Sequence, residues 1–184
     1  TRVGLVGVGN MGAPMATNLL KAGWKVTVYD SVPQKAKSFV AERGGAAAAN
    51  LADIGRSSDV VITMLPDGHV VRRVALGARE GDDCLVKGLA KGAVIVDMSS
   101  SAPVGTRELG EDLRRHDIAL LDASGAGDDP HQQWLGHGGY EEVCFERLVG
   151  EELDGDGAPR RALTAGEKAG VDALAQGFGG GFIG

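Results

Sequence analysis

Apolar and polar positions alternate in blocks along the first two thirds of the chain. Short apolar runs rich in β-branched residues have strand length, and the stretches between them have the mixed spacing of surface helices. This order indicates a parallel sheet covered by helices on both faces, so we predict a doubly wound α/β fold. The expected strands are residues 3–6, 25–29, 46–49, 59–65, 93–98 and 118–123, and the expected helices are residues 11–22, 33–42, 51–56, 69–76, 86–90 and 104–116.

Local polar residues mark where two of these helices begin. Asn50 precedes the helix at 51–56 and is a plausible N-cap, because its side chain can accept a hydrogen bond from a first-turn N–H. Ser99, Ser100 and Ser101 precede Pro103 and are expected to cap the helix that follows it. Capping alone would account for these serines without any role in binding.

A glycine-rich turn joins the first expected strand to the first expected helix. Gly7 allows the tight bend, Gly9 removes a side chain where N–H groups would approach a pyrophosphate, and Gly12 lets the helix pack on the strand. The helix N-terminus adds free donors and the positive end of a dipole. Asp30 ends the second strand, 18 residues after Gly12, where a carboxylate can accept hydrogen bonds from ribose hydroxyls. These residues predict a dinucleotide site on a sheet of the Rossmann type.

Composition excludes several classes of function. The net charge is −6, and residues 1–123 carry 15 Lys/Arg against 14 Asp/Glu, so no basic face for nucleic acid emerges. No apolar run approaches the roughly 18 residues of a membrane span, and no secretory leader opens the chain. Cys84 and Cys144 are too few for a disulfide framework, which favours the cytoplasm. His131 and His137 lack the spacing of a metal pair, so no metal is expected.

A compositional boundary lies near residue 123. Residues 124–184 hold 15 of the 30 glycines and carry 4 Lys/Arg against 11 Asp/Glu. So few apolar residues cannot offset the entropy of ordering this segment. We therefore expect a dinucleotide-binding domain at 1–123 and a glycine-rich, acidic and partly disordered tail at 124–184.

The run from Gly4 to Leu20, GLVGVGNMGAPMATNLL, resembles the signature of the β-hydroxyacid dehydrogenases, a family that includes 3-hydroxyisobutyrate dehydrogenase and tartronate semialdehyde reductase. Three later stretches agree in order and spacing, namely ITMLP at 62–66, DMSS at 97–100 and LDA at 121–123. The resemblance covers about residues 2–123. It implies hydride transfer between NAD and a small 3-hydroxy acid or its semialdehyde. The cofactor contacts that it implies, together with those of the glycine pattern, are Gly7, Val8, Gly9, Asn10, Met11, Gly12, Asp30, Met64, Leu65, Pro66 and Ser100.

The choice of coenzyme depends on the end of the second strand. Asp30 is followed by Ser31 where an arginine would pair with a 2′-phosphate, and a carboxylate repels that phosphate, so NAD is favoured over NADP. Lys35 and Lys37 lie nearby and keep NADP open.

The chain departs from the family after Ala123. Relatives continue with Pro-Val-Ser-Gly-Gly, whose Ser and Gly hold the substrate carboxylate, and Ser124 and Gly125 are the counterparts here. The proton-donating lysine of the family has no match, because Lys168 is wrongly spaced, and the acidic tail replaces the all-helical second domain. The catalytic residues, the substrate and the possibility of a homo-oligomer therefore stay open.

Three readings of function follow from this pattern. An NAD-dependent hydroxyacid dehydrogenase comes first. The alternative is a non-catalytic NAD-binding or interaction protein, a relative whose tail is truncated, diverged or out of frame. An enzyme of the 6-phosphogluconate dehydrogenase type is less favoured, because the tail offers no basic pocket for a phosphate.

Overall fold

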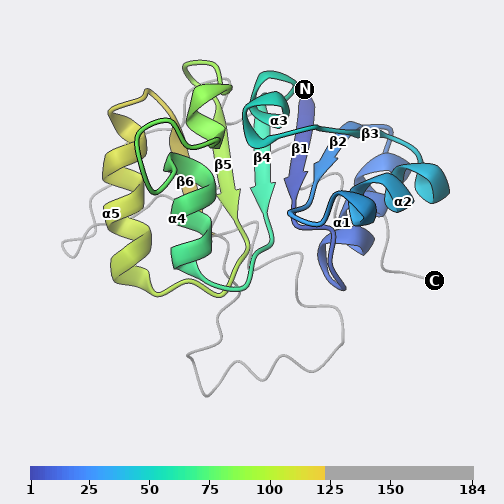
Figure 1. The fold of residues 1–184 in the computed structure, drawn as a ribbon, viewed down its shortest axis with the longest axis horizontal. Coiled ribbons are helices and arrows are strands. Elements are labelled where there is room, and N and C mark those ends of the chain that lie inside the picture. The colour runs from blue at the N-terminus through green and yellow to red at the C-terminus, as the bar shows by residue number, and fades with distance from the viewer. Residues whose placement is uncertain (123–184) are drawn as a thin grey trace.

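The computed structural model describes residues 1–122, which form six strands and six helical segments. Figure 1 shows the strands side by side with the helices packed around them. Within these residues, no helix has the length and apolar character needed to cross a membrane. In chain order the elements are β1 (Arg2–Val6), α1 (Gly12–Lys21), β2 (Lys25–Tyr29), α2 (Pro33–Arg43), β3 (Ala46–Ala47), α3 (Leu51–Arg56), β4 (Val60–Thr63), α4 (Gly68–Leu76), the 3₁₀ turn η1 (Leu85–Lys87), β5 (Val94–Asp97), α5 (Pro103–Arg114) and β6 (Ala119–Asp122).

All six strands belong to one parallel sheet with the order β3-β2-β1-β4-β5-β6. The chain builds outward from β1 to β3 and then returns to place β4 on the other side of β1. Val6 lies in register with Tyr29 of β2 and with Thr63 of β4, so these strands end at one edge of the sheet. The predicted doubly wound α/β fold is confirmed, and its topological switch point lies between β1 and β4.

The core forms two layers because successive strand side chains point to opposite faces of the sheet. Val3 and Leu5 face the layer that contains Met15 and Leu19 of α1. Val6 faces the opposite layer, to which α3, α4, η1 and α5 contribute. The buried strand residues are almost all β-branched or leucine, as expected for a sheet covered on both faces.

One of two local predictions, the N-cap at Asn50 and the helix at 86–90, is confirmed. Asn50 is confirmed as the N-cap of α3, since its side chain accepts a hydrogen bond from the N–H of Asp53 at 2.8 Å. The helix expected at 86–90 is wrong: the structure has the short 3₁₀ turn η1 one residue earlier. Gly88 ends this turn and packs closely on α3, since a Cβ there would lie 1.9 Å from the carbonyl oxygen of Ala52.

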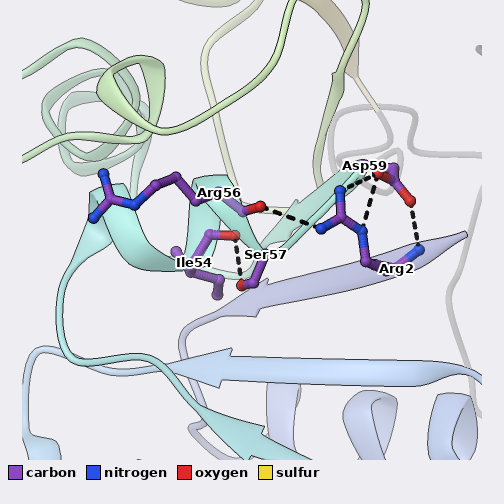
Figure 2. A network of polar contacts seen from close by, with 5 residues as sticks. All are labelled: Arg2, Ile54, Arg56, Ser57 and Asp59. Atoms are coloured by element: carbon purple, nitrogen blue, oxygen red, sulfur yellow. Dashed lines mark hydrogen bonds and ion pairs between the residues drawn. The ribbon is translucent and has the colours of Figure 1, made fainter.

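An ion pair joins the first strand to the segment before β4 at the amino edge of the sheet. Figure 2 shows the guanidinium of Arg2 reaching Asp59, with Nη2 2.6 Å and Nε 3.2 Å from Oδ1, while the backbone N–H of Arg2 donates to Oδ2 at 2.8 Å. The same guanidinium donates to the carbonyl oxygen of Arg56, at the end of α3. This network therefore ties β1, α3 and β4 together at the edge opposite the glycine-rich turn.

Removing the charge of Asp59 is expected to give a small, acid-sensitive loss of stability. The hydrogen bond from Arg2 holds the pKa of Asp59 below its usual range. A carboxyl whose pKa is lowered by folding stabilises the protein above its unfolded pKa of about 3.9, and this contribution disappears as the pH falls through the folded value. Both side chains are about half exposed, so we expect Asp59→Asn to cost roughly 0.2–1 kcal/mol at neutral pH.

Urea unfolding of wild type and Asp59→Asn at neutral pH and at about pH 3 measures this contribution. The stability difference should shrink at the lower pH, because the carboxyl of unfolded wild-type protein, with a pKa of about 3.9, binds a proton there and folding must release it. A difference that is the same at both pH values would contradict the prediction.

Candidate functional site

The glycine-rich turn follows β1 at the carboxyl edge of the sheet, where the arrowheads of β1, β4 and β5 meet their loops (Figure 1). Gly7 has a φ of +102°, a conformation that L side chains rarely adopt. Its N–H donates to the carbonyl oxygen of Tyr29 at 2.8 Å, and a Cβ here would lie 2.3 Å from the carbonyl oxygen of Met64. The turn is thus packed closely against the end of β4.

The start of α1 lies open next to this turn. Gly9, Asn10 and Met11 are exposed, and the N-cap residue Met11 makes no side-chain hydrogen bond. The first turn of α1 also carries no acidic residue, whereas α3 and α4 are capped by the side chains of Asn50 and Asp67. The N–H of Ala13 donates to the carbonyl oxygen of Gly9 at 3.1 Å and Pro14 has no N–H, so the first turn of α1 offers an anion the N–H of Gly12 and the positive end of the helix dipole.

Asp30 lies between the glycine-rich turn and the start of α2. Its Oδ2 accepts a hydrogen bond from the N–H of Val8 at 3.0 Å, and its Oδ1 accepts one from the N–H of Val32 at 2.9 Å. Asp30 is only 8% exposed. The carboxylate thus ties the two loops together, and the N–H of Val8 already has a partner. Sequence reasoning did not anticipate this contact, which joins residues 22 positions apart.

The phenol of Tyr29 precedes this carboxylate in β2. Burial raises the pKa of Tyr29, and the negative charges of Asp83 and Asp30 raise it further. The phenol therefore stays protonated at neutral pH and adds no negative charge beside Asp30.

The loops after β4 and β5 bring the remaining described candidates to the same edge. Met64 and Leu65 are partly buried, whereas Pro66 and Ser100 are exposed. The N–H of Leu65 donates to the hydroxyl of Ser99 at 2.9 Å, which joins the two loops. The turn at 7–12, Asp30, residues 64–66 and Ser100 thus share one edge, while Ser124 and Gly125 lie outside the described residues.

The serines before α5 do not cap that helix, so this prediction was wrong. The N-cap of α5 is Ala102, which has no side-chain cap. The hydroxyls of Ser99 and Ser101 instead bond to Leu65 and to Asp97, respectively. Sequence reasoning gave no role to Asp97, a buried carboxylate at the end of β5, although the stretch DMSS at 97–100 had marked it as part of the family pattern.

A groove of about 470 Å³ lies between α1 and α2, away from the loops after β4 and β5. Lys21, Lys35, Arg43 and Glu42 line it, and it reaches the candidate residues only at Val8. We therefore place the candidate site at the carboxyl edge of the sheet and not in this groove. In the part of the chain that the structure describes, no group of three or more His, Cys, Asp or Glu is arranged to hold a metal ion.

Comparison with known proteins shows the family of the chain. Residues 2–132 match the NAD binding domain of 6-phosphogluconate dehydrogenase. The chain belongs to this family. A probable 3-hydroxyisobutyrate dehydrogenase-like protein of Arabidopsis thaliana is 40% identical over 129 residues, which cover 70% of this chain and 42% of that protein. The 3-hydroxyisobutyrate dehydrogenase of Pseudomonas aeruginosa is 35% identical over 163 residues, 89% of this chain and 50% of that one.

A solved structure gives the same result. The 3-hydroxyisobutyrate dehydrogenase of Mycobacterium tuberculosis with L-serine superimposes with a TM-score of 0.59 at 34% identity, covering 66% of this chain and 39% of that one. The predicted membership of the β-hydroxyacid dehydrogenase family is thereby confirmed. The chain spans half or less of the length of these relatives. A similarity over 89% of the chain also extends beyond residue 123 into the acidic segment.

Proposed function

We propose that the chain binds NAD at the carboxyl edge of the sheet and serves hydride transfer between NAD and a small 3-hydroxy acid or its semialdehyde. The nicotinamide coenzyme supplies the hydride acceptor or donor when it is bound. The protein supplies the phosphate cradle, the ribose contacts and the orientation of the reacting carbon. Residues 1–123 form the dinucleotide-binding domain in this proposal, and residues 124–184 belong to the substrate side.

The open amino end of α1 is the observation that carries the proposal. Gly9 is exposed, and a Cβ built there would meet nothing within 4 Å, so a pyrophosphate has room to approach the backbone. The N–H of Gly12, at the start of the uncapped helix, would then face that phosphate together with the positive end of the helix dipole. Asn10 and Met11, which precede the helix, would contribute N–H donors at the same place.

Asp30 supports NAD over NADP. Each of its oxygens accepts one backbone hydrogen bond and keeps a second lone pair for a ribose hydroxyl. A 2′-phosphate would meet this carboxylate and Ser31 without an arginine at that position. Lys35, which lines the groove between α1 and α2, and Lys37 are the nearby cations that would weaken this preference.

The substrate class rests on the relatives. Two curated relatives and the solved structure carry the name 3-hydroxyisobutyrate dehydrogenase, and the solved structure is described with L-serine. Ser124 and Gly125 are the proposed contacts to the substrate carboxylate. An enzyme of the 6-phosphogluconate type stays less favoured, because the tail offers no basic pocket for its phosphate.

A non-catalytic NAD-binding protein is the second candidate. Hydride transfer needs a group that exchanges the alcohol proton, a contribution of about 10²–10⁴-fold, and the sequence offers no counterpart of the family lysine. This candidate shares the cofactor site and differs only in turnover.

Two measurements on the full chain separate these functions. Calorimetric titration should show NAD binding at least about tenfold tighter than NADP. Absorbance of reduced nicotinamide with a panel of 3-hydroxy acids, including L-serine, then tests turnover at high protein concentration. Binding without turnover would favour the non-catalytic protein, and no heat with either coenzyme would overturn both candidates.

A further inference from the structure

A buried carboxylate joins the two loops at the second half of the candidate site. Asp97 ends β5 and is 1% exposed. Its Oδ1 accepts hydrogen bonds from the hydroxyl of Thr63 at 2.9 Å and from the N–H of Ser99 at 3.0 Å, and its Oδ2 accepts one from the hydroxyl of Ser101 at 2.7 Å. One side chain thus binds the last residue of β4 and both ends of the segment 99–101.

Ser99 extends the same network to the loop after β4. It is 1% exposed, its hydroxyl accepts a hydrogen bond from the N–H of Leu65 at 2.9 Å, and that hydroxyl lies 3.5 Å from the carbonyl oxygen of Thr63, to which it donates. The loops also pack directly on each other, since a Cβ at Gly68 would lie 3.3 Å from the side chain of Ser101. The backbone of Leu65 and the segment that carries Ser100 are therefore fixed relative to each other.

Stability alone is a poor explanation for this arrangement. Burying a carboxylate is costly, and well-packed apolar side chains commonly stabilise a core as well as a buried polar network does. What the network provides is a fixed geometry, because several directional hydrogen bonds hold two loops in one arrangement. The loops in question follow β4 and β5, on the far side of the switch point from Asp30 (Figure 1).

We propose that Asp97, Thr63, Ser99 and Ser101 are positioning residues for the nicotinamide half of the cofactor. A doubly wound sheet binds one mononucleotide on each side of its switch point, so the half built from β1 to β3 takes the adenosine end and the half built from β4 to β6 takes the nicotinamide end. The network acts through Leu65, Pro66 and Ser100 and does not touch the cofactor. This inference rests on the proposed NAD site.

Removing one hydroxyl of the network tests whether it positions the nicotinamide half of the site or only supports the fold. In Ser99→Ala the N–H of Leu65 loses its acceptor. Calorimetry should show NAD affinity lower by about tenfold, because the loop of Leu65 is no longer held in place and NAD binding must reorder it at a cost on the order of one hydrogen bond, while ADP affinity stays within about twofold of wild type. ADP probes only the adenosine half. Ser57→Ala is the matched control, since it also deletes a hydroxyl that bonds to a backbone group, the carbonyl oxygen of Ile54, at the opposite edge (Figure 2).

Substitutions at Asp97 provide a rescue test. Asp97→Asn can keep all three contacts, because its oxygen accepts from Thr63 and Ser99 while its NH₂ donates to the hydroxyl of Ser101. We expect its NAD affinity to stay within about threefold of wild type, whereas Asp97→Ala should lose about tenfold or more. A charge-dependent role would make Asn as damaging as Ala and would overturn the proposal.

Hydrogen exchange gives a readout that needs no cofactor. The amide of Leu65 should exchange faster in Ser99→Ala than in wild type, and Ser57→Ala should leave it unchanged. Faster exchange with an unaltered ratio of NAD to ADP affinity would overturn the proposal, and so would an equal loss of both ligands. Wild-type protein that binds neither ligand would instead overturn the proposed NAD site, and the positioning role would fall with it.

Discussion

Gly9→Ala is expected to fold like wild type and to lose about a hundredfold in NAD affinity, because forcing a methyl group into a close contact costs about 1–3 kcal/mol. The substitution is tolerated by the free protein, since a Cβ at Gly9 would meet nothing within 4 Å and its φ lies outside the positive range. The added methyl group occupies the space through which a pyrophosphate would approach the backbone N–H groups. Calorimetric titration with NAD measures the loss, and urea unfolding checks the fold.

Gly110→Ala is the control for this experiment. Gly110 lies in the middle of α5, away from the glycine-rich turn. A Cβ there would make an ordinary 3.8 Å contact with Leu120. It should bind NAD like wild type. Wild-type affinity in Gly9→Ala would show that the pyrophosphate does not lie over Gly9 and would overturn the proposed site.

Gly12→Ala is expected to lower the stability of the fold itself by about 3 kcal/mol, a typical upper value for overpacking. A Cβ at Gly12 would lie 1.8 Å from the carbonyl oxygen of Gly7 and 3.2 Å from the side chain of Leu5. Backbone atoms cannot move aside as a flexible side chain can, so α1 must shift away from β1. Because domains are stable by only about 5–15 kcal/mol, the midpoint of urea unfolding should fall clearly.

Gly110→Ala is also the control for Gly12→Ala, because both substitutions add a methyl group to a helix. Gly110→Ala adds the same methyl group in a helix interior without a close contact, and should raise stability by up to about 1 kcal/mol. If Gly12→Ala unfolds at the wild-type midpoint, the close approach of α1 to the end of β1 is not a feature of the protein in solution.

The sequence predicted the sheet well because each strand is a local pattern. The runs at 60–63 and 94–96 are β-branched and buried on both faces, so their assignment needed no knowledge of their neighbours. The cap at Asn50 was equally local, since its partner Asp53 is three residues away.

The contacts that the sequence did not predict are those between distant residues. Ser99 was assigned to its own helix, yet its hydroxyl binds Leu65, 34 positions earlier. Asp30 was assigned to a ribose, and its carboxylate also binds the N–H of Val8, 22 positions earlier. A pattern of residue types cannot tell which of several possible partners a hydroxyl or carboxylate will meet, because the partner is chosen by the packing of the sheet.

The ion pair of Arg2 with Asp59 lies at the amino edge of the sheet, and every described candidate residue lies at the other edge. Stabilising changes in enzymes often slow turnover when they stiffen the reactive region. Here the stabilising ion pair and the candidate site lie at opposite edges of the same sheet. Stabilising substitutions around residues 56–59 would therefore lie away from the proposed NAD site.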